Sequence, residues 1–195
     1  LVLTNTNGGR ERTRGLLVSV IGGSVHGIFH IGSLGGNLLR GAVLRDVSLT
    51  DSAGAPFFAA KEIGLSYRIF PFLRQRLYFY DVTLVHPVVV LDKPPGGALN
   101  FDRIFPSDTT HAGGPGFGSW IRLRRVTMVD GDITSRSPWA PDSTLTRRQQ
   151  DSVIAYALGP EGRPDVARVP GGFQLAARFH DVYGTFPLLQ LADPK

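Results

Sequence analysis

Most of the chain alternates between apolar and polar residues with a period of two. The alternation runs through six stretches, at residues 25–31, 43–49, 63–69, 78–84, 121–133 and 173–182. Successive side chains of a β-strand point to opposite faces of a sheet, so this spacing is typical of strands with one buried face. The pattern predicts a mainly β protein that consists of a succession of antiparallel strands.

Two stretches have the spacing of a helix instead. In residues 11–22 the apolar side chains fall on one stripe, and a Gly-Gly pair ends the stretch. Residues 144–158 predict a second short helix, which ends at Gly159 and Pro160. The first of these helices precedes all of the predicted strands.

Runs of turn-forming residues divide the chain. Residues 51–56 (Asp-Ser-Ala-Gly-Ala-Pro) predict a turn between two strands. Residues 106–118 are rich in Gly, Thr, Ser and Pro and predict a flexible loop. We therefore expect a first segment at 1–105, the loop at 106–118, and a continuation of the sheet at 119–195 with an irregular insertion at about 137–168.

A strand motif recurs along the chain. Residues 44–49 (Leu-Arg-Asp-Val-Ser-Leu) resemble residues 79–84 (Phe-Tyr-Asp-Val-Thr-Leu), and looser copies lie at 124–128 and 180–183. Recurrence of this kind favours stacked β units that share one sheet. The alternative is that Asp-Val and Thr-Leu pairs recur by chance in β proteins.

The composition is that of a folded protein, and its charge alone does not select a partner. Hydrophobic residues make up 42% and charged residues 19%, while 24 glycines and 14 prolines favour a turn-rich β protein. The net charge of +5 fits nucleic acid, anionic lipid headgroups or simple solubility. Because no run of five or more like charges occurs and no basic helix pairs with stacking aromatics, we expect no nucleic-acid partner.

No apolar stretch approaches the roughly 20 residues of a membrane-spanning helix. The chain opens on Leu1 instead of Met, and its only methionine is Met128. We therefore interpret it as a fragment of a longer protein, whose signal or membrane anchor lies upstream. The absence of cysteine excludes disulfides and thiol chemistry.

The residues that carry catalytic chemistry elsewhere are not arranged for it here. His26 and His30 would lie about 13 Å apart on a strand, too far for one metal ion. Asp130 and Asp132 flank Gly131, but the pattern of a calcium loop fails after them, so we interpret this site as a bulge or turn. Neither a P-loop nor a nucleophile elbow occurs. We expect no enzymatic activity, no cofactor and no metal.

The order of the motifs in residues 16–105 resembles a known family. An Asp-Val-x-Leu strand is followed by a turn with Asp and Gly, a strand that leads into an apolar turn, and a second Asp-Val-x-Leu strand. A Pro with a hydrophobic strand and Gly-x-Leu-Asn come next. These parts lie at 46–49, 51–54, 60–69, 70–73, 81–84, 87–91 and 97–100. In this order they resemble the N-terminal region of the AsmA/TamB-like group of bacterial envelope proteins.

The resemblance implies a fold, a location and a function. The fold would be a curved, repetitive antiparallel sheet that forms an open, taco-shaped groove behind a short N-terminal helix. The parent protein would be anchored in the inner membrane, with a periplasmic body that reaches towards the outer membrane. Its function would be phospholipid transport between the two membranes and outer-membrane assembly. Its partners would be phospholipid acyl chains and an outer-membrane barrel protein.

Period-two strands supply an apolar face on which acyl chains would lie. The residues that we expect to line this groove are Val43, Val47, Leu49, Ile63, Leu65, Tyr67, Tyr80, Val82 and Leu84. The alternative is that the same residues pack a closed sandwich or barrel. Two other functions stay open: a scaffold that assembles outer-membrane or secreted proteins by strand addition at its edges, and a glycan-binding β domain.

Overall fold

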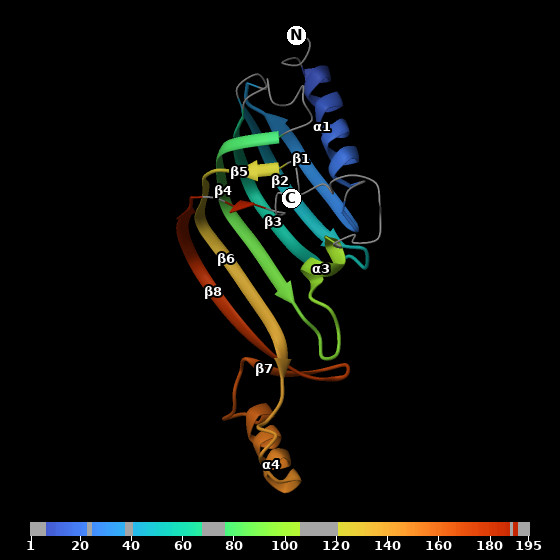
Figure 1. Cartoon of the computed structure of the whole chain (residues 1–195), viewed down its shortest axis with the longest axis vertical. Helices are drawn as coiled ribbons and strands as arrows, with labels where there is room; N and C mark the ends of the chain where they lie inside the picture. The colour runs from blue at the N-terminus through green and yellow to red at the C-terminus, as the bar shows by residue number, and fades with distance from the viewer. Residues whose placement is uncertain are drawn as a thin grey trace.

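The protein consists of one open, curved β-sheet with helices at one face and at one end (Figure 1). The computed structural model describes residues 7–22, 25–37, 41–67, 77–105, 121–187 and 189–190. The helices are α1 (Asn7–Gly22), α3 (Asn100–Ile104) and α4 (Arg147–Leu158). The strands are β1 (Gly27–Gly35), β2 (Gly41–Asp51), β3 (Pro56–Tyr67), β4 (Leu77–Asp92), β5 (Ile121–Leu123), β6 (Val126–Trp139), β7 (Val166–Val169), β8 (Gly172–Phe186) and β9 (Leu189–Gln190). The predicted mainly β class, the open curved sheet and the short N-terminal helix are confirmed.

The strand order is β1-β2-β3-β4-β6-β8-β7, so the segments before and after the gap at residues 106–120 belong to one sheet. All neighbours on this path are antiparallel except β4 and β6, which are parallel, with Val82 opposite Val126 and Val89 opposite Ile133. The prediction of a wholly antiparallel sheet is therefore wrong at this pair. A parallel neighbour requires a crossover back to the starting end of the first strand, and the long connection between β4 and β6, which contains α3, provides it. The flexible loop predicted at 106–118 lies outside the described residues.

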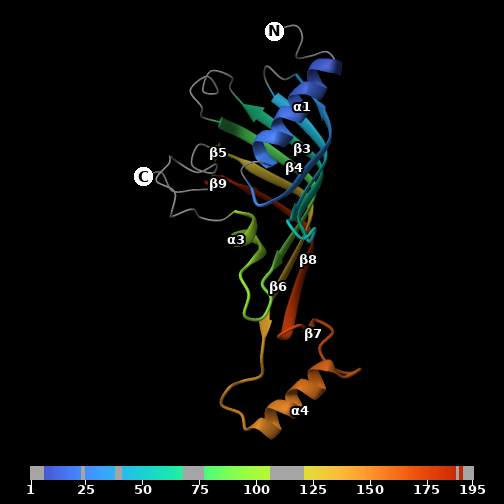
Figure 2. The same cartoon turned by 90° about the vertical axis from the view of Figure 1, so that its right-hand side faces the viewer.

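The two faces of the sheet have different coverings. We call the face that carries α1 and α3 the inner face, and the opposite one the outer face (Figure 2). The main buried cluster on the inner face draws on five neighbouring strands, and Val18 of α1 packs against it. Its members are Ile31, Leu34, Ala42, Leu44, Val47, Ala60, Ile63, Val82 and Val126. A second cluster places Ile104 of α3 against Val25 and Leu49.

A row of left-handed residues crosses the sheet. Asp46 on β2, His86 on β4, Asp130 on β6 and Asp181 on β8 have φ angles of 52°, 47°, 56° and 52°. Aspartate and histidine enter this region more readily than most residues other than glycine. The flanking pairs set Asp46 opposite Lys61 and Lys61 opposite His86, so these positions form one line across neighbouring strands.

At this row the alternation of inward and outward side chains along each strand changes phase. On β2 the buried residues are Leu44 on one side of the row and Val47 on the other, three positions apart, while Arg45 and Asp46 are both exposed. The buried residues Ile31 and Leu34 of β1 have the same spacing. Two consecutive side chains therefore point outward at the row, and the period of two resumes with the opposite phase.

The row also requires a glycine on the edge strand β1. Gly32 of β1 lies beside Asp46, and a Cβ atom at position 32 would stand 2.9 Å from the Cβ of Asp46. Real Cβ atoms do not approach so closely, and the obstacle is a Cβ on a backbone that is itself fixed in the sheet. The close approach of β1 and β2 at the row therefore requires the missing side chain.

The stretch predicted as irregular, 137–168, is partly regular. Strand β6 continues to Trp139, and α4 begins after Thr146, whose backbone and side chain form a capping box with Gln149. The helix ends before Gly159, as the sequence predicted. It projects beyond β7 at the end of the sheet that lies far from the N-terminus (Figure 1).

The left-handed row predicts that glycine and valine have opposite effects at neighbouring positions of β2. At Asp46, valine should lower the free energy of unfolding by about 1–2 kcal/mol, because a β-branched residue enters the left-handed region at the highest cost. Glycine there should change it by less than about 0.5 kcal/mol. Urea unfolding of Asp46→Val and Asp46→Gly measures both effects.

Ser48 serves as the control, because it lies on the outer face of the same strand with ordinary strand geometry. There glycine should lower the free energy of unfolding by about 0.5–1 kcal/mol, and valine should be tolerated. The same order of stability for the two substitutions at positions 46 and 48 would show that the left-handed conformation does not constrain the sheet.

Candidate functional site

The inner face carries most of the residues predicted to line a groove. Four of the predicted residues are buried in the clusters described above: Val47, Leu49, Ile63 and Val82. Three more are half-buried and pack against the main cluster: Leu65, Tyr67 and Leu84. These seven residues form one continuous apolar surface, and part of it lies beneath α1 and α3.

Two of the predicted lining residues lie elsewhere. Val43 occupies the outer face, because the switch at Asp46 puts it out of phase with Val47. Tyr80 lies at a bulge of β4, where the pairing shifts between Ser66–Asp81 and Tyr67–Phe79, and its side chain is 36% exposed. An uninterrupted period of two would place both residues on the same face as the other seven.

The part of the inner face that remains accessible lies on β8. Phe179 is opposite Ile133 and Phe186 is opposite Val126, so both rings belong to the inner face. They are 55% and 50% exposed. The alternation of β8 contained this signal, but the left-handed residue Asp181 between the two rings breaks the spacing that would have linked them.

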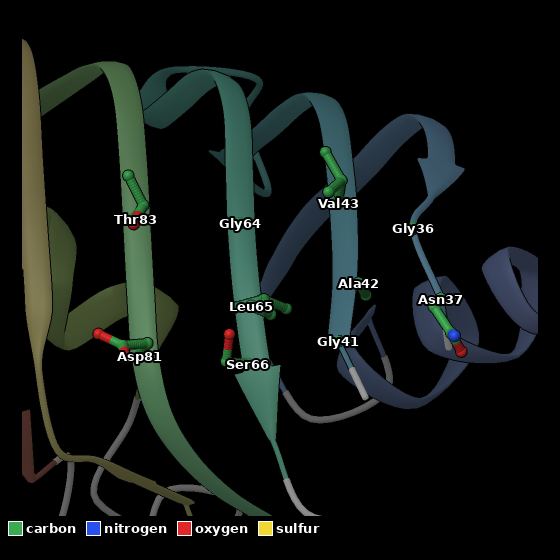
Figure 3. A pocket seen from close by; sticks show the side chains of 10 residues that line it. All are labelled: Gly36, Asn37, Gly41, Ala42, Val43, Gly64, Leu65, Ser66, Asp81 and Thr83. Carbon is green, nitrogen blue, oxygen red and sulfur yellow. The ribbon is translucent and has the colours of Figure 1, made fainter. Parts of the chain in front are cut away.

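The outer face has a shallow depression of about 370 Å³ near the start of β4 (Figure 3). Gly64 lies between Val43 and Thr83 in neighbouring strands, and its missing side chain leaves the hollow. Ser66 and Asp81 line its lower part in the same view. The depression is therefore small, and its lining mixes polar residues with Val43 and Leu65.

A bidentate ion pair borders this depression. The Nε and Nη2 atoms of Arg125 donate to the two carboxylate oxygens of Asp81 at 2.5 and 2.6 Å. The hydrogen bonds from the Arg125 guanidinium hold the pKa of Asp81 below its usual range. Beyond the pair lies a second depression of about 330 Å³, lined by Tyr80, Arg124, Arg125 and Pro187.

Two histidine–aspartate pairs connect the strands at the left-handed row. His86 Nδ1 lies 2.6 Å from an oxygen of Asp130 and joins β4 to β6. His180 Nδ1 lies 2.7 Å from an oxygen of Asp132 and joins β6 to β8. The predicted bulge at Gly131 is confirmed, since the pairing of β6 with β8 shifts on both sides of it. Among the described residues, no group of three or more His, Cys, Asp or Glu side chains is placed to hold a metal ion.

Comparison of the chain with protein-family models, with curated proteins and with solved structures returned no match. The resemblance to AsmA/TamB-like proteins therefore stays a prediction. Within the described part of the chain, every helix is too short or too polar to cross a membrane.

The Asp81–Arg125 pair predicts that the fold loses stability at acidic pH. Because the pKa of Asp81 is lowered in the folded protein, the pair stabilises the fold above the ordinary carboxyl pKa of about 4. That contribution is lost as the pH falls through the lowered pKa. In Arg125→Gln the pKa of Asp81 should rise towards its ordinary value, as followed by NMR titration of the carboxyl carbon.

Asp165 provides an internal control for this titration. Its pKa is lowered by hydrogen bonds from Arg163, in the segment after α4 and far along the chain from Asp81. It should titrate identically in the parent protein and in Arg125→Gln. An unchanged Asp81 titration would show that Arg125 does not hold the carboxylate in solution.

Proposed function

We propose that the protein is a segment of a lipid-carrying β-sheet of the bacterial envelope, which shields phospholipid acyl chains on its inner face. The observation that carries the proposal is an open sheet with one apolar face that continues across β1, β2, β3, β4 and β6 to the exposed rings of β8. An acyl chain in water costs about 0.8 kcal/mol per CH₂ group, or on the order of 10 kcal/mol for an ordinary tail. An apolar face removes most of this cost.

The accessible strip of the inner face indicates where a chain would lie. Helices α1 and α3 occupy the inner face over β1 to β4, so the open surface is the strip formed by Phe179, Val182 and Phe186 beside β6. The envelope location, the inner-membrane anchor and the role in outer-membrane assembly rest on the sequence resemblance. The apolar strip supplies the physical part of the proposal.

A second candidate is a scaffold that binds an extended strand of another protein. Strand β7 pairs only with residues 172–175 of β8, so residues 177–186 of β8 form an edge without a neighbouring strand among the described residues. A long free edge presents unpaired N–H and C=O groups, on which strand addition depends. Outer-membrane β-hairpins would fit such an edge.

Photo-crosslinking from two aromatic positions of β8 tests the lipid proposal. Phe179 faces inward, while Tyr183 lies on the outer face with a similarly exposed ring, at 65%. Each is replaced in turn by p-benzoylphenylalanine, and the purified protein is irradiated with phospholipid vesicles. Mass spectrometry should find a phospholipid adduct at position 179 and none at position 183, because acyl chains should bind to the apolar inner face.

The same pair of positions separates the two candidate functions. A strand added at the edge of β8 would lie close to both faces of β8, so a hairpin peptide should crosslink from both positions. Equal lipid capture at 179 and 183, or no capture at 179, would rule out an acyl-chain path on the inner face. Hairpin capture together with absent lipid capture would favour the scaffold.

A further inference from the structure

Among the described residues, the guanidinium of Arg124 has no partner, and it lies in the depression that it shares with Tyr80, Arg125 and Pro187. Backbone hydrogen bonds to β4 hold this segment in place. The N–H of Arg124 donates to the carbonyl of Phe79 at 2.9 Å, and the carbonyl of Arg125 accepts from the N–H of Val82 at 2.8 Å. The side chain of Arg124 is exposed and makes no hydrogen bond or ion pair with the described residues. The neighbouring Arg125 is already held by Asp81.

The surroundings of Arg124 suit a phosphate group. The depression of about 330 Å³ adds the exposed Tyr80 and Pro187 to the two guanidiniums. A guanidinium presents a planar fork of donors that matches phosphate oxygens, and a tyrosine hydroxyl adds a further donor. Because the charge of Arg125 is offset by Asp81, Arg124 supplies the net positive charge of the site.

The whole end of the sheet around this site is basic. Arg10, in the first turns of α1, donates to the carbonyl of Gly36, which lines the first depression together with Asp81. Helix α1 begins at the end of the sheet where β4 starts (Figure 1), and Asp81 lies near the start of β4. Two described carboxylates near this end, Glu11 and Asp81, are each paired with an arginine. Arg10, Arg12 and Arg124 have no carboxylate partner among the described residues, and we call their surface the basic end.

We propose that the basic end docks on an anionic phospholipid surface, with a headgroup phosphate bound by Arg124 and Tyr80. Among the described residues, guanidiniums without a carboxylate partner lie on α1 and beside the paired strands β4 and β6, and this arrangement matches a plane of many phosphates better than one soluble anion. Each arginine near such a surface strengthens binding about fivefold. This docking uses the basic end of the molecule, and does not depend on acyl-chain binding at the strip of Phe179, Val182 and Phe186.

The test measures binding of the purified protein to vesicles of phosphatidylcholine with phosphatidylglycerol, and to vesicles of phosphatidylcholine alone. We expect binding to the anionic vesicles only, and Arg124→Gln should weaken it about fivefold. Arg148→Gln is the matched control, since Arg148 is an equally exposed arginine of α4 at the opposite end. It should leave vesicle binding unchanged. Circular dichroism checks that both variants fold.

Three outcomes would overturn the proposal. Equal binding to neutral and anionic vesicles would remove the role of charge. Equal weakening by the two substitutions would show that net charge acts without a site. Binding of inorganic phosphate that depends on Arg124, together with vesicle binding that does not, would assign the site to a soluble anion. None of these results bears on lipid capture at Phe179, so this proposal and the lipid path can fail separately.

Discussion

The arrangement of both faces depends on the backbone of one row of residues that crosses the sheet. At Asp46, His86, Asp130 and Asp181 the chain enters the left-handed region, and the strands exchange the faces of their side chains. A residue other than glycine enters this region at a cost of about 1–2 kcal/mol. Each fully buried Val, Leu or Ile side chain offsets this by about 1.5–3 kcal/mol. The strain is tolerated because it returns apolar residues to the inner face on both sides of the row.

The same row gathers polar groups on the outer face. Two consecutive outward residues on each strand bring Arg45 near Glu62, His86 near Asp130, and His180 near Asp132. These pairs stay accessible to water, where each ion pair contributes little to the free energy of unfolding. The apolar clusters therefore lie on the inner face and these ion pairs on the outer face, and this division is the physical basis of the proposed function.

The recurring Asp-Val motif has a different meaning in the structure than in the sequence. Asp46 belongs to the left-handed row, which the cross-strand pairs extend through Lys61 to His86. Asp81 lies opposite Ser66, several residues away along β4, and holds Arg125. The two copies of the motif are therefore not equivalent positions of stacked units. Asp181 shares the conformation of Asp46, whereas the resemblance of 44–49 to 79–84 reflects only the common composition of half-buried strands.

The sequence by itself determined the long strands, the two helices that it predicted at 11–22 and 144–158, and the apolar character of the residues that became the inner face. These features follow from local periodicity and capping residues. It did not determine which face each residue joined. That depended on φ angles at single aspartates and a histidine, which leave no mark on hydropathy. Val43 shows the consequence, because the change of phase at Asp46 puts it on the outer face. The parallel pairing of β4 with β6, and the meeting of Tyr80 with Arg124 and Pro187, were likewise decided by tertiary structure, since they join segments that a long crossover separates in the chain.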